Sequence, residues 1–500
     1  MSEMIAHLSL GFAVALTFQN LALAFVGCLV GTLIGVLPGV GPVATIAMLL
    51  PVTFGLDPVS ALIMLAGIYY GAQYGGSTTA ILVNIPGEST SVVTTLDGHQ
   101  MARQGRAGTA LGIAAIGSFF AGTVATILIA AVGGPLASVA MMFGPAEYFS
   151  LMVMGLVFAV VLANGSVFRA ILMILLGIML AGVGTDIQTG ETRMTGGFDF
   201  LADGIDFAVL AMGLFGIAEI LRNLEGHETR DIVNQPIGRL LPTLQDMRRS
   251  LAPILRGTAV GSILGVLPGN GAVLGPFCSY TLEKKLSSNP QGFGKGAIEG
   301  VAGPESANNA GAQTSFIPLL TLGIPPNAVM ALMVGAMTIQ GIVPGPQVMT
   351  KNPDLFWGMI ASMWIGNLML LIINLPLIGV WVRFLKVPYR LMFPAIVMFC
   401  CIGIYSIGAQ PADVVGIGVF GLFGYLMFKV GFEPAPLLLG FVLGELMEES
   451  LRRALMLSRG DPLVFLERPI SAVVLTLAVL ALAITLMPRM RRKRETVFAE

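Results

Sequence analysis

Long apolar runs separated by short polar breaks make up most of this sequence. Each clear run approaches the roughly 17–25 residues that a helix needs to cross a bilayer. Together with less regular runs between them, they predict an all-α polytopic membrane protein with roughly 10–12 transmembrane helices. The clearest runs are about 109–133, 147–163, 168–184, 206–221, 356–382, 391–407, 412–428 and 470–487.

Two apolar runs are interrupted by nearly the same short motif. GVLPGVG occupies residues 35–41, and GVLPGNG occupies residues 265–271. Proline lacks an N–H and glycine permits a tight reversal, so each motif should end one helix and let another begin. PVATIAMLLP, after the first motif, is too short to cross as a helix. We therefore expect broken helices or reentrant hairpins, which membranes tolerate only inside protein or beside a watery cavity.

A longer similarity follows each motif and indicates an internal repeat. ALIMLAGIYYGAQYGGSTTAI at 61–81 aligns with AIEGVAGPESANNAGAQTSFI at 297–317, with alanines, glycines and hydroxyl residues matching in order. The most polar connection lies between the two halves. The predicted segments are a first half 1–221 (helix break 35–42, polar cluster 73–90), a cytoplasmic linker 222–256, a second half 257–410 (helix break 265–271, polar cluster 304–327), and C-terminal scaffold helices with a basic cytoplasmic tail, 411–500.

Polar residues gather after both breaks and predict a binding site. A restarted helix points free N–H groups at the cavity, which suits an anion, and hydroxyl or amide donors suit carboxylate oxygens. The same residue types also connect membrane helices, which is the structural alternative for each of them. The candidate substrate-binding residues are Gly39, Val40, Gly41, Ser77, Thr78, Thr79, Pro86, Gly87, Gly269, Asn270, Gly271, Asn308, Asn309, Gln313, Thr314 and Ser315. The candidate Na⁺ ligands are Gln73, Asn84, Glu88, Glu305 and Asn309.

Composition and charge narrow the class of function. The chain is 55% hydrophobic and 11% charged, against roughly 25% charged residues in soluble domains. No H-E-x-x-H motif, Ser–His pairing or Cys–His cluster is evident, so an intramembrane enzyme is disfavoured, and no catalytic residue is predicted. A passive anion channel is the other disfavoured alternative. The four cysteines follow no disulfide or metal-ligand spacing and are predicted to be buried free thiols.

Charged segments suggest an orientation. PRMRRKR follows the last apolar run, and such basic segments stay in the cytoplasm, which predicts a cytoplasmic C-terminus. TLDGHQMARQGRAG at 95–108 is predicted to be a short loop on the same side, with an exposed His99. In GELMEESLRRAL, two glutamates precede two arginines by four residues, which predicts ion pairs at a solvated helix end.

With these motifs, and with EKKLS, FGKG and GFVLGELMEESLRRAL, the sequence closely resembles the large membrane subunit of tripartite tricarboxylate transporters. The likeness covers about residues 10–460. It implies a binding-protein-dependent importer of a citrate-like di- or tricarboxylate in the bacterial inner (cytoplasmic) membrane, coupled to a cation gradient. Its implied partners are a small four-helix membrane subunit and a soluble periplasmic solute-binding protein, with no nucleic acid.

The resemblance also implies inverted repeats that form a mobile, elevator-like transport domain. The oxygen-rich, histidine-poor clusters favour Na⁺ over H⁺ as the coupling ion, with H⁺ coupling as the alternative. LGIPPN at 322–327 departs from the glycine-rich stretch expected after IP. The particular carboxylate, including an aromatic one, therefore stays open.

Overall fold

The computed structural model describes residues 2–37, 41–162, 166–186, 188–225, 238–268, 271–385 and 389–487, which are mostly helical. Six helices in these ranges are long and apolar enough to cross a membrane, and six shorter apolar helices accompany them. An all-α polytopic membrane protein agrees with this finding, while the number of crossings stays a prediction. The six longer ones are Phe18–Val36, Ala102–Ala140, Phe207–Glu225, Pro353–Asn374, Pro411–Lys429 and Pro469–Leu486.

The first four helices contain the first helix break, between α2 and α3, and end in a long buried helix, α4. They are α1 (Ser2–Ala15), α2 (Phe18–Val36), α3 (Pro42–Thr53) and α4 (Pro58–Val83). Helix α2 ends just before the first LPG motif, and α3 begins at Pro42, whose fixed φ suits a first helical turn, so the helix break lies where the motif predicts. Helix α4 begins after Asp57, whose carboxylate caps Ser60 N, and every residue from Ser60 to Val83 is buried.

The segment that was predicted to be a loop at 95–108 is helical and largely buried, so that prediction is wrong. Short turns lead from Ser89–Ser91 through α5 (Val92–Thr94) to π-helical turns at Thr95–His99 and Ala102–Arg106. Asp97 is fully buried, and His99 is buried with Nδ1 3.1 Å from the Ile81 carbonyl oxygen. Arg103 and Gln104 stay exposed, and Arg106 bonds the Asp246 side chain at 2.6 Å, so only part of this segment faces the solvent.

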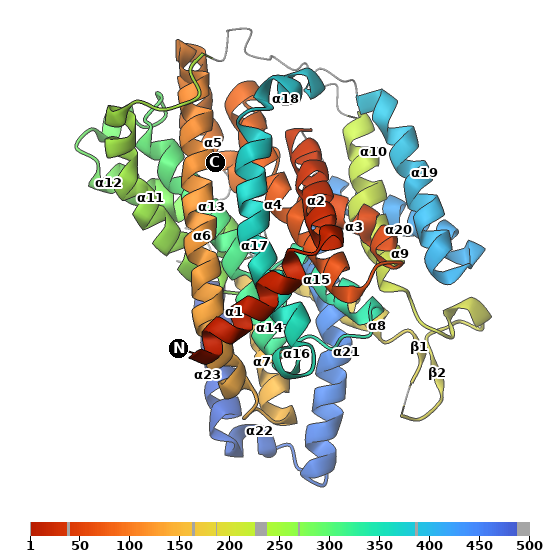
Figure 1. The fold of residues 1–500 in the computed structure, drawn as a ribbon. Coiled ribbons are helices and arrows are strands. Elements are labelled where there is room, and N and C mark those ends of the chain that lie inside the picture. Colours follow the sequence, from red (N-terminus) through yellow and green to blue (C-terminus); the bar gives the residue numbers. More distant parts are fainter. Residues whose placement is uncertain are drawn as a thin grey trace.

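Long helices and a small hairpin complete the first half. The elements are α6 (Ala107–Ala140), α7 (Pro145–Leu162), α8 (Val167–Ala181), β1 (Gly184–Thr185), β2 (Thr192–Arg193), a 3₁₀ turn Asp199–Leu201, α9 (Phe207–Ala211), a π-helical segment Met212–Ile217 and α10 (Ala218–Glu225). The strands pair antiparallel, with Thr185 opposite Thr192. Figure 1 shows the hairpin at the lower right, away from the central helices.

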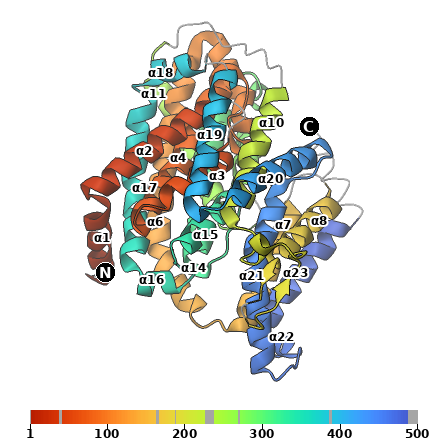
Figure 2. The same cartoon turned by 90° about the vertical axis from the view of Figure 1, so that its right-hand side faces the viewer.

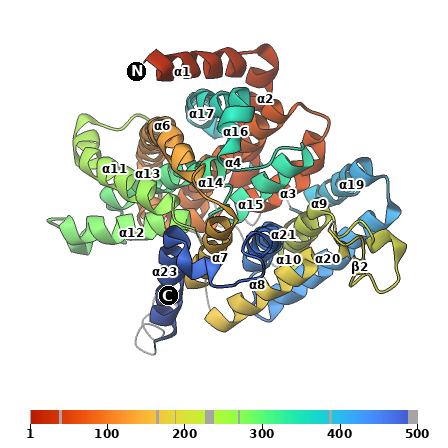
Figure 3. The same cartoon turned by 90° about the horizontal axis from the view of Figure 1, so that it is seen from below.

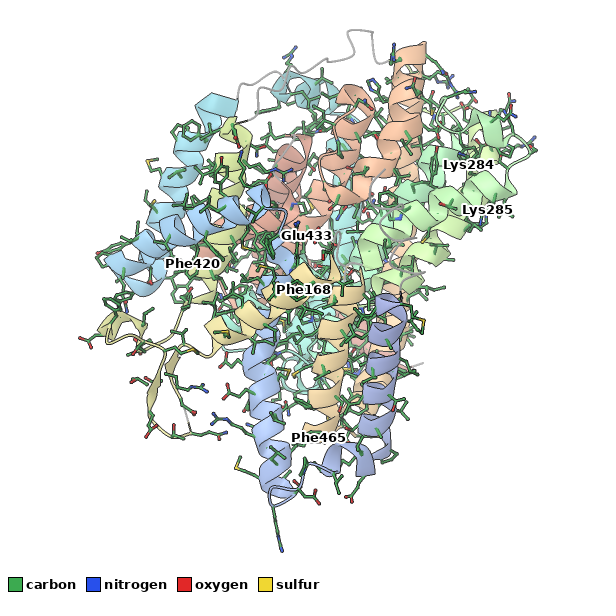
Figure 4. All side chains as sticks on the ribbon, turned by 180° about the vertical axis from the view of Figure 1, so that it is seen from behind. Phe168, Lys284, Lys285, Phe420, Glu433 and Phe465 are labelled. Atoms are coloured by element: carbon green, nitrogen blue, oxygen red, sulfur yellow. The ribbon has the colours of Figure 1, made fainter. Side chains whose placement is uncertain are left out.

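The second half begins with another broken helix. Its elements are α11 (Leu244–Gly265), α12 (Gly271–Leu286), a 3₁₀ turn Pro290–Gly292, α13 (Glu299–Thr314), α14 (Phe316–Leu322), α15 (Ala328–Ile339) and α16 (Gln347–Lys351). Helix α11 starts within the predicted linker range and ends at the second LPG motif, and α12 restarts at Gly271. Lys284 and Lys285 lie at the outer end of α12 (Figure 4).

The remaining helices are α17 (Pro353–Asn374), α18 (Ile378–Phe384), α19 (Tyr389–Gly408), α20 (Pro411–Lys429), α21 (Pro434–Leu457), α22 (Val464–Glu467) and α23 (Pro469–Leu486). The predicted run 356–382 is therefore two helices, because α17 ends at Asn374 and a turn precedes α18. Figure 2 shows α7, α21, α22 and α23 extending below the rest of the molecule, where Phe149 and Phe465 rings lie 4.9 Å apart.

Helices α4 and α13 occupy the centre of the fold. In α13, every residue from Gly300 to Thr314 is buried, and the view from below shows α4, α13, α14 and α15 ringed by the others (Figure 3). Peripheral helices are different: Phe168 of α8 is 68% exposed (Figure 4). Cys28 and Cys400 are buried as predicted and Cys401 is partly buried, whereas Cys278 is exposed and contradicts the prediction.

Ion pairs fix the hairpin to the end of α21. Arg452 bonds both oxygens of Asp186, at 3.3 and 2.8 Å, and also Glu448 at 2.6 Å, while Arg193 of β2 bonds Glu448 at 2.7 Å. The hydrogen bond from Arg452, followed by that from the Gln188 backbone N–H, lowers the pKa of Asp186 to about 2. The predicted Glu448–Arg452 pair is thus confirmed, but it also belongs to a network with the hairpin.

Candidate functional site

Each broken helix packs against a polar helix through glycines four residues apart. A Cβ at Gly31 of α2 would lie 2.3 Å from the Ile68 carbonyl oxygen of α4, and one at Gly261 of α11 would lie 2.2 Å from the Ala307 carbonyl oxygen of α13. Only glycine permits such close backbone approach. The close contacts join Gly27, Gly31 and Gly35 to Met64, Ile68 and Ala72, and Gly257, Gly261 and Gly265 to Gly303, Ala307 and Gly311.

The order of these contacts shows that the two helices of each pair are parallel. In each pair, the helix that ends at a break runs alongside the polar helix in the same direction, residue by residue. The last carbonyl groups of a helix lack intrahelical partners. Thr79 Oγ1 donates to Val36 O at 2.8 Å. Ser315 Oγ, just after α13, lies 3.2 Å from Gly265 O and 2.7 Å from Gly311 O of its own helix. A hydroxyl of the neighbouring polar segment therefore lies at each break.

Glu305 lies fully buried on α13 and bonds to residues of the first half. Ser77 Oγ donates to its Oε2 at 2.6 Å, and the Thr94 hydroxyl donates to its Oε1. Within the described ranges, the ion pairs all lie elsewhere and none includes Glu305. A buried carboxylate compensated only by hydroxyl groups is costly to keep ionised, and either a proton or a cationic ligand would remove that cost.

Glu88 makes the reciprocal connection from the first half to α13. Thr90 Oγ1 donates to Glu88 Oε1 at 2.6 Å, and Asn308 Nδ2 approaches the same oxygen at 3.3 Å. The Thr90 hydroxyl also lies 2.9 Å from Gln73 Oε1. Since a hydroxyl carries one proton, Thr90 can donate to only one of these two oxygens at a time. Gln73 and Glu88 thus form an oxygen-rich group beside Asn308.

Asp97 links the halves a third time. Its Oδ1 accepts N–H groups of Gly296 at 2.7 Å and Ala297 at 2.8 Å, just before α13, and its Oδ2 accepts the Tyr280 hydroxyl at 2.9 Å. A carboxylate suits the unpaired N–H groups near a helix start. The segment 95–99 therefore positions α13, and with it Glu305.

A narrow pocket opens beside Glu305. Its empty space, counted with the mouth, is about 300 Å³, but only about one or two water-sized spheres fit between the lining atoms. In this conformation it has room for a small ion or water rather than for a citrate-sized anion. The lining residues are Tyr74, Ser77, Thr78, Leu111, Ala114, Ala115, Ser118, Glu305, Asn374, Leu375 and Ile378.

The structure brings together only some of the predicted site residues. Gly39, Val40, Gly269 and Asn270 lie outside the described residues. Asn84 is exposed at the end of α4 and is not brought to the Glu88 or Glu305 groups. The predicted residues that do lie in or beside the two polar helices are Gln73, Ser77, Thr78, Thr79, Glu88, Glu305, Asn308, Asn309, Gln313, Thr314 and Ser315. Those at the helix ends and connections are Gly41, Pro86, Gly87 and Gly271.

Sequence reasoning missed polar residues from α4, α6 and α17. Asn309 Nδ2 donates to Ser118 Oγ at 2.6 Å, and Tyr74 OH donates to Asn367 Oδ1 at 3.0 Å. Asn374 lines the pocket at the end of α17. Ser118, Asn367 and Asn374 are each isolated in an apolar run, a signal that also fits ordinary helix contacts, whereas Tyr74 lies within the predicted polar cluster 73–90. Only the packing brings them together.

Within the part of the chain that the structure describes, three buried amide oxygens on α13 and α17 accept no hydrogen bond: Asn308 Oδ1, Gln313 Oε1 and Asn374 Oδ1. Buried polar atoms usually have a partner, so such oxygens call for an explanation such as an ion or water. Among the described residues, no three His, Cys, Asp or Glu side chains form a metal site. The oxygens present are those of the carboxylates of Glu88 and Glu305, of amides and of hydroxyls, which fit a hard cation better than a transition metal.

Comparisons place these features in a family. The sequence matches the Tripartite tricarboxylate transporter TctA family over residues 21–439. The "Uncharacterized 52.8 kDa protein in TAR-I ttuC' 3'region" of Agrobacterium vitis is 60% identical over 500 residues, which cover 100% of both chains. The "Uncharacterized protein in TAR-II ttuC' 3'region" of the same organism is 64% identical over 240 residues, 48% of this chain and 99% of that protein. No solved structure matches. The chain therefore belongs to the tripartite tricarboxylate transporter TctA family and is a membrane subunit of a tripartite transport system.

Proposed function

We propose that this chain is the large membrane subunit of a binding-protein-dependent secondary transporter that imports a di- or tricarboxylate with Na⁺. The observation that carries the proposal is a pair of reciprocal contacts between the two halves: Glu88 accepts a hydrogen bond from Asn308, and Glu305 accepts one from Ser77. Interrupted helices at corresponding places in two halves are typical of the binding sites of secondary transporters. Family membership supports the same conclusion.

The substrate carboxylates would bind near the restarted helices α3 and α12. Free N–H groups and the positive dipole end of a helix favour an anion there. Hydroxyl and amide groups of the two polar clusters would orient the carboxylates, with Asn309 on α13 as one donor. The two halves would be inverted repeats that move together as an elevator-like domain, while outer helices form the scaffold.

Cation coupling follows from the cost of moving an anion into a negative cytoplasm. Each charge costs about 2.3 kcal/mol per 100 mV, so a trianion faces roughly 7 kcal/mol per 100 mV. Co-transported Na⁺ would cancel this cost, and the oxygen groups around Gln73, Glu88 and Glu305 are its candidate ligands. A passive channel would not use the gradient and would not accumulate solute, which separates the two functions experimentally.

The proposed partners are a small four-helix membrane subunit and a soluble periplasmic solute-binding protein. The two membrane subunits would lie in the bacterial inner membrane. The C-terminus would face the cytoplasm. The test is uptake of radiolabelled carboxylate into proteoliposomes that contain all three components, with and without an inward Na⁺ gradient. Asn309→Ala is compared with Asn352→Ala at the exposed start of α17.

We expect Na⁺-dependent accumulation that Asn309→Ala abolishes and Asn352→Ala leaves unchanged. Uptake that does not depend on Na⁺ would contradict the coupling. Equilibration without accumulation would indicate a channel. Normal uptake by Asn309→Ala would leave Asn309 as a contact between α13 and Ser118 of α6 only.

A further inference from the structure

We propose that the pocket beside Glu305 is a binding site for one monovalent cation, and that Asn374 of α17 completes it. The proposed ligands come from three parts of the fold: Glu305 from α13, Ser77 or Thr78 from α4, and Asn374 from α17. As a coupling site it rests on the proposed function, but cation binding itself can be measured without transport.

Glu305 has unused bonding capacity. An ionised carboxylate has about four lone-pair sites. Hydroxyls of Ser77 and Thr94 occupy one site on each oxygen, and Glu305 belongs to none of the ion pairs among the described residues. Its side chain is 0% exposed, so bulk water does not compensate the charge. A cation in the adjoining pocket would do so.

Asn374 independently provides an unpaired oxygen at the same pocket. This side chain is 5% exposed and lines the same pocket. Its Nδ2 donates to Leu370 O at 2.9 Å and approaches Thr32 Oγ1 at 3.4 Å, which fixes the orientation of the amide. The Oδ1 accepts no hydrogen bond. A buried amide oxygen held in place without a donor is suited to coordinate a cation.

The size of the pocket fits a small ion. The pocket has room for about one or two water-sized spheres, which excludes a carboxylate substrate in this conformation but admits a dehydrated small ion. The available oxygens belong to one carboxylate, one amide and neutral hydroxyls. One negative charge matches a monovalent cation, and a divalent ion would remain uncompensated. Hard oxygen ligands favour Na⁺ over softer ions.

Such an ion would connect α13 and α4 to α17. The consequence is that occupancy stabilises the contact of the central polar helices with α17 and α18. Trp381 of α18 donates to Ile373 O, one residue before Asn374, so tryptophan fluorescence can report on this region. Trp364 lies on the same helix α17.

The experiment measures cation binding to the full chain in nanodiscs without substrate. Thermal unfolding and tryptophan fluorescence are followed in NaCl, LiCl, KCl and choline chloride at equal ionic strength. For the wild type, we expect a rise in Tm and a saturable fluorescence change with Na⁺ over choline. Glu305→Gln and Asn374→Leu should weaken Na⁺ binding by at least about 10-fold, equivalent to about 1.4 kcal/mol.

Asn374→Asp separates coordination from packing. It adds a charged oxygen at the same place, so it should retain or strengthen Na⁺ binding, whereas a merely structural Asn374 would be damaged by both substitutions. Glu219→Gln on α10 serves as the matched control, because Glu219 is a half-buried carboxylate outside the pocket, and it should keep the full response. If Glu305→Gln does not fold, Asn374→Leu and Asn374→Asp still decide the question.

The proposal is overturned if wild type responds equally to Na⁺ and choline, or if both Glu305→Gln and Asn374→Leu keep the wild-type Na⁺ affinity. Na⁺-driven uptake together with unchanged affinity in these variants would place the coupling ion elsewhere and overturn this site alone. Conversely, Na⁺ binding lost in both variants, in a protein that accumulates no carboxylate, would support the site and contradict the proposed function.

Discussion

Ser77 and Glu305 come from opposite halves of the chain, yet Ser77 Oγ donates to Glu305 Oε2 at 2.6 Å in a fully buried position. A hydrogen bond to a charged group contributes roughly 1.5–3 kcal/mol. We expect Ser77→Ala to lower the free energy of unfolding by about that amount and to reduce uptake, while Ser77→Thr keeps much of both. Denaturation in detergent and the proteoliposome assay measure the two effects.

The control for this prediction is Ser406→Ala, because Ser406 bonds only Ile402 O on the exposed side of α19. Its effect should stay within about 0.5 kcal/mol. Equal losses for Ser77→Ala and Ser406→Ala would contradict a special role for the buried contact.

The glycine contacts give a prediction whose sign depends on position. Gly31→Ala and Gly261→Ala should each destabilise by roughly 1–3 kcal/mol, because the new methyl group would overlap a backbone carbonyl oxygen. In α20, by contrast, a Cβ at Gly418 meets nothing within 4 Å. Gly418→Ala should therefore be neutral or stabilise by roughly 0.5–1 kcal/mol. Unfolding midpoints of the three variants test the difference, and a stabilising Gly261→Ala would refute the close approach.

Asp97 and Tyr280 should be energetically coupled. Asp97→Ala removes the acceptor for the Tyr280 hydroxyl and for two N–H groups before α13, whereas Tyr280→Phe removes only the hydroxyl. A double-mutant cycle should give a coupling of roughly 0.5–3 kcal/mol. The same cycle on the exposed Tyr425–Glu225 hydrogen bond should give less. Additive effects at Asp97 and Tyr280 would show that this bond does not stabilise the junction.

The hairpin network predicts a stability that depends on pH. Because the folded protein lowers the pKa of Asp186 to about 2, its ion pair with Arg452 stabilises the fold above the unfolded pKa near 3.9. This contribution should be lost as the pH falls from about 4 towards 2. The Tm difference between wild type and Asp186→Asn should therefore shrink in that window. A Tm difference that stays constant between pH 4 and pH 2 would contradict this account.

The helix breaks were predictable because their cause is local. Proline and glycine limit the backbone at their own positions, so the sequence indicated where α2 and α11 end. The role of Asp97 was not predictable in this way, since its partners are the backbone of Gly296 and Ala297 and the Tyr280 side chain, far along the chain. A charged stretch with a buried partner looks like a solvated loop until the fold is known.

The two polar clusters were predictable from the sequence, but the residue of another helix that lines the same pocket was not. Glu305 was noticeable as a carboxylate in an uncharged stretch. Asn374 is one amide in a long apolar run, and only the packing of α17 against α4 and α13 gives it a distinct environment. Conversely, Asn84 looked equivalent to its neighbours by composition, yet its left-handed backbone conformation ends α4 and leaves it exposed.

The length of α6 affects how much of the protein projects from the membrane. Its 34 residues extend about 51 Å at 1.5 Å per residue, whereas the hydrocarbon layer is about 30 Å thick. Even a tilt of about 40° leaves about 39 Å along the membrane normal. Helix α6 packs against α4, α11, α13 and α17. At least one of its ends therefore projects beyond the hydrocarbon layer, and a soluble protein that approaches from that side would meet protein before it meets lipid.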